Sequence, residues 1–127
     1  MKKIMVVDDD DGILDAISVL LESSNFEVET SPDGEALLKL ETKNLPDLIL
    51  LDVLLSGKDG RELCKILKSQ KSTKQIPIIM LSAHPSASET VADFGADDFI
   101  PKPFEMDELL NKIHKHLTKR KIKKHEN

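Results

Sequence analysis

Strand-like and helix-like patterns alternate along the whole chain. Short apolar or β-branched runs occupy residues 3–7, 26–30, 47–55, 76–81 and 98–100, and segments with helical spacing lie between them. Runs that are apolar almost throughout, without the alternation of a half-exposed sheet, are typical of parallel strands that are covered on both faces. The pattern therefore predicts an α/β fold in which a doubly wound, five-stranded parallel sheet lies between helices.

Amphipathic stripes predict the helices that cover this sheet. Asp10 or Asp11 is placed to cap the first helix, because a short carboxylate accepts hydrogen bonds from the free amides of the first turn. A weakly patterned helix is expected within residues 86–94, and Gly95 is expected to end it. The residues expected to face inward on the other helices are Ile13, Ile17, Leu20 and Leu21, then Leu37 and Leu40, then Leu63, Ile66 and Leu67, and finally Met106, Leu109, Leu110, Ile113 and Leu117.

Composition is typical of a globular protein with one domain. The chain has 127 residues, of which 39% are hydrophobic and 32% charged. No apolar run approaches the ~18 to 20 residues of a membrane span, and the apolar residues before Asp8 are too few for a signal-peptide core. Cys64 is the only cysteine, so an internal disulfide is excluded. We expect a cytoplasmic protein that does not bind membranes.

The net charge of −5 is unevenly distributed. Residues 119–127 contain five Lys or Arg and one Glu, so this tail carries +4 and the other 118 residues carry −9. An acidic body argues against direct binding of nucleic acid. We expect a domain of residues 1–118 that is followed by a basic tail, residues 119–127, in a frayed or disordered state.

Polar residues occur where the apolar runs end. Asp8 and Asp9 follow the first strand, Asp52 interrupts the third, Ser82 follows the fourth, and Lys102 comes shortly after the fifth. In open parallel sheets, ligands bind at the carboxyl ends of the strands, beside the point where the strand order reverses. The common order 2-1-3-4-5 puts that point between the first and third strands. Asp52 is therefore expected to lie centrally, between the aspartate pair and the Ser82 and Lys102 side chains.

Three carboxylates in one cleft match the ligands of a hard divalent cation. Mg²⁺ binds one or two carboxylates and keeps waters and phosphate oxygens in its other positions. A bound cation would let a phosphoryl group approach a further carboxylate, while Lys102 and Ser82 contact phosphoryl oxygens from the far side. Phosphoryl transfer depends mainly on positioning and charge stabilisation. The sequence therefore predicts a Mg²⁺-dependent phosphoryl-transfer site.

Four motifs at these strand ends resemble the receiver domain of bacterial two-component response regulators, and stand-alone chemotaxis-type receivers in particular. They are VVDD at 6–9, LLDVLLSGKDG at 50–60, MLSAH at 80–84 and FIPKPF at 99–104, and the resemblance covers about residues 2–118. It implies a flavodoxin-like fold and a signalling protein that assists only its own phosphorylation and dephosphorylation, rather than an enzyme.

The resemblance also implies a role for each residue of the cleft. Asp52 would accept a phosphoryl group from a histidine kinase or a phosphotransfer protein. Asp9 would bind Mg²⁺ directly, Asp8 would bind it through water, and the backbone carbonyl of Leu54 would complete the protein ligands. Lys102 would pair with the phosphoryl group, and the peptide bond between Lys102 and the following proline is often cis in this family.

A switch is implied as well. The Ser82 hydroxyl would move to the phosphoryl group, and the position of the Phe99 side chain would change with the active state. Helix 4, strand 5 and helix 5 of the family fold would then present a different surface to a downstream protein partner. A phosphorylation-dependent dimer is a further expectation.

The loop after the acceptor departs from the family pattern. Family members usually have a proline four residues after the acceptor, and this chain has Ser56. Loss of that proline predicts a more mobile loop over residues 53–58, which bears on metal affinity and on phosphoryl lifetime. Leu54 and His84 fall where family members vary, and a bulky Leu54 would shield a phosphoaspartate from water.

Two other functions fit part of the pattern. A Mg²⁺-dependent phosphatase of the haloacid dehalogenase type also opens on a strand that ends in D-x-D, but this chain is short for that fold and lacks room for a cap. A flavodoxin-like electron carrier would need backbone amides and hydroxyls at the tip of the first strand, where this chain has aspartates. Steady hydrolysis of a phosphate ester would favour the phosphatase, and a yellow protein the electron carrier.

Overall fold

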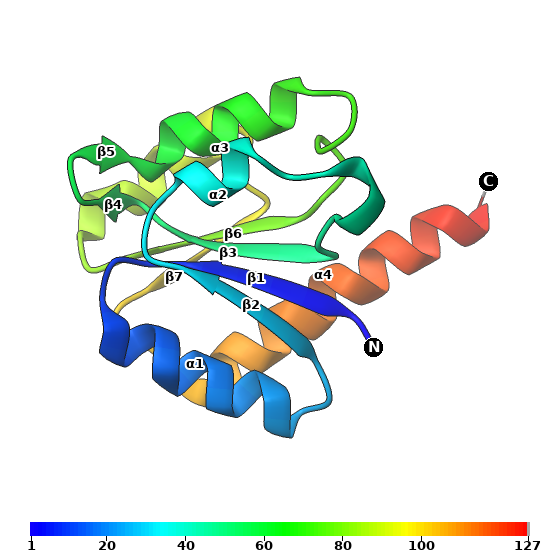
Figure 1. Ribbon diagram of the computed structural model, residues 1–127, viewed down its shortest axis with the longest axis horizontal. Coiled ribbons are helices and arrows are strands. Elements are labelled where there is room, and N and C mark those ends of the chain that lie inside the picture. The colour runs from blue at the N-terminus through cyan, green and yellow to red at the C-terminus, as the bar shows by residue number, and fades with distance from the viewer. Residues whose placement is uncertain (127) are drawn as a thin grey trace.

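A five-stranded parallel sheet lies between two layers of helices (Figure 1). The computed structural model describes the backbone of residues 1–126 and the side chains of residues 1–118 other than Pro85. The strand order is β2-β1-β3-β6-β7, which is the predicted order 2-1-3-4-5 once two short hairpin strands are left out. The sheet strands are β1 (Lys3–Val7), β2 (Glu27–Ser31), β3 (Leu48–Asp52), β6 (Ile78–Ser82) and β7 (Asp98–Pro101).

The third strand is shorter than the apolar run over residues 47–55 predicts. It ends at Asp52, and the next apolar residues form β4 (Leu54–Leu55), which pairs antiparallel with β5 (Lys58–Asp59). Gly57 at the tip of this hairpin has a φ of +72°, a conformation that glycine adopts without steric cost. The hairpin extends beyond the carboxyl end of β3 (Figure 1).

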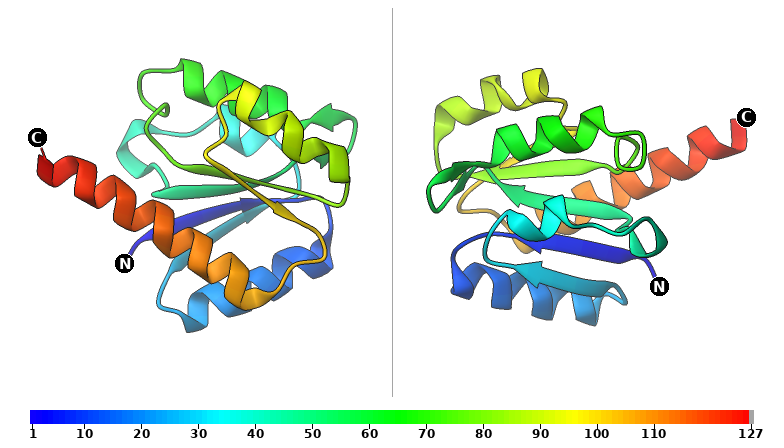
Figure 2. Two further views of the ribbon diagram at one scale, coloured as in Figure 1. Left: turned by 180° about the vertical axis from the view of Figure 1, so that it is seen from behind. Right: turned by 45° about the horizontal axis from the view of Figure 1, so that its top comes forward.

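Helices cover both faces of the sheet. One face carries α1 (Asp11–Ser23) and α4 (Met106–Glu126), and the other carries α2 (Glu35–Leu38) and α3 (Gly60–Ser69) (Figures 1 and 2). Asp10 caps α1 as predicted, because its side chain accepts a hydrogen bond from the Ile13 amide. A 3₁₀ helix, η1 (Thr42–Asn44), precedes β3.

The segment predicted as a helix within residues 86–94 is not an α-helix. It forms two 3₁₀ helices, η2 (Pro85–Glu89) and η3 (Val91–Phe94). Only Ala87 and Val91 are buried along it, so the described part of the segment lacks the continuous apolar stripe that stabilises an α-helix in a protein. Gly95 ends the segment as predicted, with a φ of +92°.

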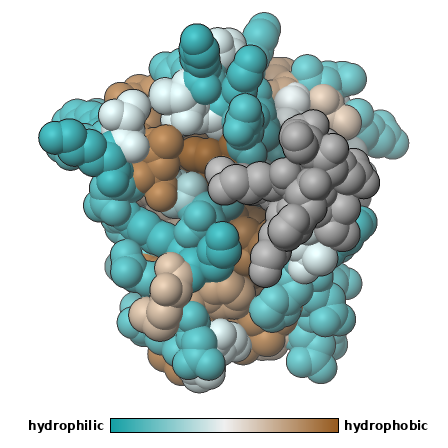
Figure 3. Space-filling model, turned by 90° about the vertical axis from the view of Figure 1, so that its right-hand side faces the viewer, coloured by the Kyte–Doolittle hydropathy of each residue, from teal (hydrophilic) through white to brown (hydrophobic). Residues whose placement is uncertain are grey.

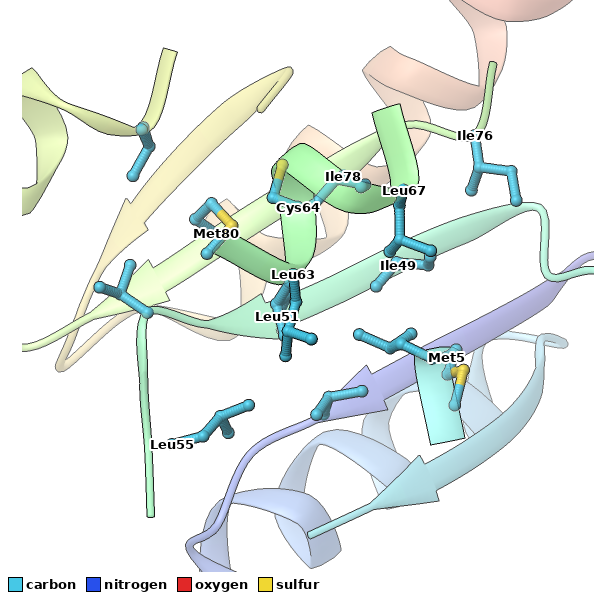
Figure 4. Close-up of a cluster of buried hydrophobic side chains, with 14 of the residues drawn as sticks. Met5, Ile49, Leu51, Leu55, Leu63, Cys64, Leu67, Ile76, Ile78 and Met80 are labelled. Atoms are coloured by element: carbon cyan, nitrogen blue, oxygen red, sulfur yellow. The ribbon is translucent and has the colours of Figure 1, made fainter. Parts of the chain in front are cut away.

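The core has two halves, one on each side of the sheet. Figure 4 shows the half in which Leu63, Cys64 and Leu67 of α3 face the side chains of β3 and β6. Cys64 is fully buried, as predicted, and burial raises the pKa of its thiol to about 11. Ile66 is 39% exposed, because Cys64 takes the inward position on the helix face. The second half includes Leu109 and Ile113 of α4 and residues of α1.

The predicted domain end at residue 118 falls inside α4, whose backbone is helical to Glu126. Asn127 and the side chains of the basic tail lie outside the described residues, so the division into a domain and a tail stays a prediction. The face at the amino ends of the strands shows hydrophilic residues around smaller hydrophobic areas (Figure 3). Within residues 1–126, no helix combines the length and the hydropathy of a membrane span.

Candidate functional site

The ends of β1 and β3 bring the predicted carboxylates together. Val7 is paired with Leu51 in the sheet, so Asp8 and Asp52 follow on neighbouring strands. Carboxylate oxygens of Asp8, Asp9 and Asp52 all lie within 4.8 Å of one another. Asp8 is fully buried and Asp52 is 6% exposed, whereas Asp9 is exposed. This cluster, which we call the acidic cleft, combines three hard oxygen donors, so its chemistry fits a Mg²⁺ ion.

Asp8 is held in place by donors on both of its carboxylate oxygens. The Asp10 amide donates to Oδ1 over 2.9 Å, and the Lys102 ammonium donates to Oδ2 over 2.7 Å. The backbone amide of Asp8 itself donates to the carbonyl of Ser31. These contacts fix the orientation of a charged group that water does not reach.

Lys102 enters the cleft from β7. Its amide donates to the Ser82 carbonyl over 2.9 Å, which continues the pairing of β6 with β7. Its Nζ lies 2.7 Å from Asp8 Oδ2 and 3.4 Å from Asp52 Oδ2. Burial lowers the pKa of the Lys102 ammonium, but its hydrogen bonds and charge interactions with Asp8 and Asp52 outweigh this and raise the pKa. The peptide bond between Lys102 and Pro103 is cis, as in the family that the motifs resemble.

The contact with Lys102 only partly offsets the effect of burial on the Asp52 carboxylate. Burial raises its pKa to about 6, with the Asp8 charge acting in the same direction, while Lys102 and the Leu54 amide oppose the rise. That amide lies 3.5 Å from Asp52 Oδ1 and is a weak donor at this distance. One lysine serves two buried carboxylates, so the cleft would gain from a further positive charge.

Ser82 lines an open pocket of about 380 Å³ together with Asp52, His84 and Lys102. Its hydroxyl accepts a hydrogen bond from the His84 amide over 3.0 Å. Leu54, at the rim, exposes 71% of its surface. The structure therefore brings Ser82, Lys102 and Asp52 together as the sequence predicts, with Leu54 at the mouth.

Ser56 makes a contact that the sequence did not predict. Its hydroxyl donates to Asp9 Oδ2 over 2.9 Å. The hairpin is thereby connected to the acidic cleft by a side chain that replaces the usual proline. No signal in the sequence identified this contact, because the two residues are far apart in the chain.

Gly60 lets α3 begin directly against the end of β3. A Cβ at this position would lie 2.0 Å from the Asp52 carbonyl oxygen. The Gly60 amide donates to the Val53 carbonyl, and Asp59 caps α3 by accepting from the Arg61 amide. Only glycine permits this backbone approach.

Arg61 connects α3 to the two 3₁₀ helices. Its guanidinium pairs with Asp59 over 2.8 Å and donates to the Thr90 hydroxyl over 2.7 Å. It also lies over the Phe94 ring, 5.4 Å from the centroid, in a cation–π arrangement. The sequence contains the arginine but no pattern that pairs it with Thr90.

A second charged cluster joins β7 to α4, next to the predicted switch residue. Asp98 accepts from Lys112 over 3.0 Å and from the ring of His116 over 2.8 Å. Lys112 also donates to the Phe99 carbonyl over 2.8 Å. Burial raises the pKa of Asp98, but the His116, Phe99 amide and Lys112 donors outweigh it and lower the pKa to about 2. The Phe99 side chain is partly buried and packs on the α3 side of the sheet.

Comparison with known proteins places this arrangement in a family. The family model for the response regulator receiver domain matches residues 4–114. The chain is similar to the response regulator MprA of Mycobacterium sp. (strain KMS), with 41% identity over 113 residues that make up 87% of this chain and 48% of that protein. The chain thus spans about half the length of the curated relatives that it matches.

Two solved response regulators are similar to this chain in both fold and length. A response regulator from Chloroflexus aurantiacus superposes with a TM-score of 0.86 at 37% identity, covering 92% of this chain and 98% of the other. The response regulator TrrA of Thermotoga maritima, solved in complex with Mg²⁺–BeF, gives a TM-score of 0.82 at 32% identity and covers 91% of this chain and 99% of its own.

Proposed function

The chain belongs to the response regulator receiver domain family of two-component systems, and from this premise we propose that Asp52 accepts a phosphoryl group. The donor would be a histidine kinase or a phosphotransfer protein. The observation that carries the proposal is the grouping of three carboxylates within 4.8 Å around an acceptor whose Oδ2 lies 3.4 Å from the Lys102 ammonium. The match of residues 4–114 to the receiver family favours this role over the phosphatase and the electron carrier.

Mg²⁺ would be held by Asp9 and Asp52 directly, by Asp8 through water, and by the Leu54 carbonyl. When bound, the ion supplies positive charge that lets an anionic phosphoryl group approach a carboxylate. Burial, and after it the Asp8 charge, raises the pKa of Asp52 to about 6, and a bound cation would favour the ionised form of this carboxyl. TrrA, which is similar in fold and sequence, was solved with Mg²⁺ in its complex.

The transfer itself is a displacement at phosphorus. An Asp52 carboxylate oxygen forms the new P–O bond, the P–N bond to the donor histidine breaks, and the imidazole leaves with the bonding electron pair. The Lys102 ammonium exchanges its contact with the Asp52 oxygen for one with a phosphoryl oxygen. The Ser82 hydroxyl, which lines the same cleft, donates to another phosphoryl oxygen.

Phosphorylation would change the surface formed by η2–η3, β7 and α4, to which a partner would bind. These elements lie together in the rear view of Figure 2. Movement of Ser82 would displace the backbone that follows it, and a changed Phe99 position would alter the same surface. Phosphorylation would have to favour one pre-existing state by a few kcal/mol. A downstream protein would read this surface in the cytoplasm, without direct nucleic-acid contact, and a phosphorylation-dependent dimer is an alternative readout.

Intact mass spectrometry tests the proposal. Incubation with Mg²⁺ and a small acyl phosphate should add one phosphoryl group, since transfer from the acyl oxygen releases a carboxylate. The adduct should be absent in Asp52→Asn and suppressed by a chelator. Asp11→Asn is a matched control, because Asp11 lies in the first turn of α1 and should not affect the adduct. An equal adduct in Asp52→Asn would move the acceptor elsewhere.

A further inference from the structure

Ser56 is the contact through which the β4–β5 hairpin reaches the acidic cleft. Its hydroxyl donates to Asp9 Oδ2 over 2.9 Å across 47 positions of sequence. The hairpin is anchored on its other side by Leu55, which is 2% exposed. Proline, the residue that the family usually has here, has no hydroxyl and could not make this bond.

Asp9 has a different partner from the other two carboxylates of the acidic cleft. Asp8 and Asp52 share the Lys102 ammonium at 2.7 and 3.4 Å. Asp9 lies at the exposed end of the cluster and accepts a hydrogen bond from the Ser56 hydroxyl. A carboxylate has two oxygens, so a donor that holds one of them leaves the other for a metal. Hydrogen bonds to ligating carboxylates orient them and tune metal affinity.

We propose that Ser56 is a positioning residue for cation binding. Its hydroxyl holds the Asp9 carboxylate in one orientation and fixes the hairpin whose Leu54 carbonyl would complete the ligand set. Ser56 does not bind the metal itself. This inference rests on the proposed Mg²⁺ site and deepens it. In this chain, a side-chain hydrogen bond restrains the loop at the position where the family usually has a proline.

The role of Ser56 is tested by titrating the metal-free protein with Mg²⁺ in a calorimeter and measuring the dissociation constant. Ser56→Ala should weaken Mg²⁺ binding about three- to tenfold, the effect of losing one ordinary hydrogen bond. Ser56→Thr retains the hydroxyl and should bind within about twofold of the unsubstituted chain. Because Ser56 is exposed, the urea midpoint of metal-free Ser56→Ala should not change, which separates positioning from folding.

Ser69→Ala is the matched control, since the Ser69 hydroxyl bonds the Ile66 carbonyl at the end of α3. Unchanged or tighter Mg²⁺ binding in Ser56→Ala would overturn the inference, as would equal weakening in Ser69→Ala. If the unsubstituted chain forms the Asp52 adduct while Ser56→Ala binds Mg²⁺ normally, the positioning role of Ser56 is refuted and the proposed function of Asp52 stands. If the unsubstituted chain binds no Mg²⁺, the proposed metal site falls with it.

Discussion

Asp52 is buried at the carboxyl end of β3 and Asp98 is partly buried at the start of β7, and their pKa values lie on opposite sides of the ordinary value of 3.8. Burial and the Asp8 charge raise the pKa of Asp52 to about 6. At Asp98 burial acts in the same direction, but donors from His116, the Phe99 amide and Lys112 lower the pKa to about 2. Asp52 is raised mainly by burial and then by the neighbouring Asp8 charge, whereas at Asp98 several donors together outweigh burial.

The ionised form of Asp98 stabilises the fold, whereas the ionised form of Asp52 destabilises it. Each carboxylate oxygen of Asp98 has its own close donor, at 3.0 and 2.8 Å, so ionisation favours the folded state. Asp52 shares one lysine with Asp8, so its ionisation opposes folding until another cation arrives.

Removal of the shared lysine should give the largest effect. Lys102→Met leaves two buried carboxylates without a cation and should cost about 3 kcal/mol of unfolding free energy at neutral pH. Lys112→Met should cost only about 1 kcal/mol, because Asp98 keeps His116 and the Phe99 amide. Urea denaturation without divalent cations measures both values, and equal losses would contradict the comparison.

Asp98→Asn should destabilise the protein by about 2 kcal/mol at pH 7. The folded-state pKa of about 2 lies below the ordinary value of 3.8, so this stabilisation is complete above pH 4. It should disappear as the pH falls from about 4 to about 2. Unfolding curves at both ends of that range test the sign, and a constant difference between the variants would refute it.

Asp52→Asn should have a smaller effect of opposite sign. The folded-state pKa of about 6 lies above 3.8, so ionised Asp52 lowers stability progressively as the pH rises from about 4 to about 6. The substitution should therefore stabilise the metal-free protein by about 1–2 kcal/mol at pH 7.5 and have almost no effect near pH 4. Added Mg²⁺ should reduce the gap by stabilising only the unsubstituted chain. Destabilisation at pH 7.5 would show that the charge is compensated.

Leu54→Asn should change stability least, by less than about 0.5 kcal/mol, because Leu54 is 71% exposed at the rim. Its effect should fall on the phosphorylated protein. A polar side chain there would admit water to the phosphoaspartate and accelerate decay of the adduct a few-fold. Decay followed by intact mass decides this, and an unchanged rate would remove the shielding role.

The sequence predicted the parallel sheet and its strand order because apolar runs with helical spacers leave few other packings. It also located the cleft, since each polar residue came at the end of a strand. Local detail was less predictable. Continuation of the apolar run past Asp52 concealed the turn into the hairpin, and the weak pattern in residues 86–94 concealed two 3₁₀ helices.

Contacts between distant side chains were beyond the reach of sequence patterns. The Ser56–Asp9 and Arg61–Thr90 hydrogen bonds and the Asp98–His116 pair join residues whose spacing has no period. Each depends on where the folded backbone puts a flexible side chain. Their existence follows from tertiary structure rather than from local propensity.

The close approach of Gly60 to the end of β3 has a consequence for engineering. Because the carbonyl of Asp52 occupies the space that any larger residue at position 60 would need, α3 and the end of β3 cannot be redesigned separately. Residues 52–60 would have to be transplanted between proteins as a single cassette, and libraries that vary this loop should keep position 60 fixed.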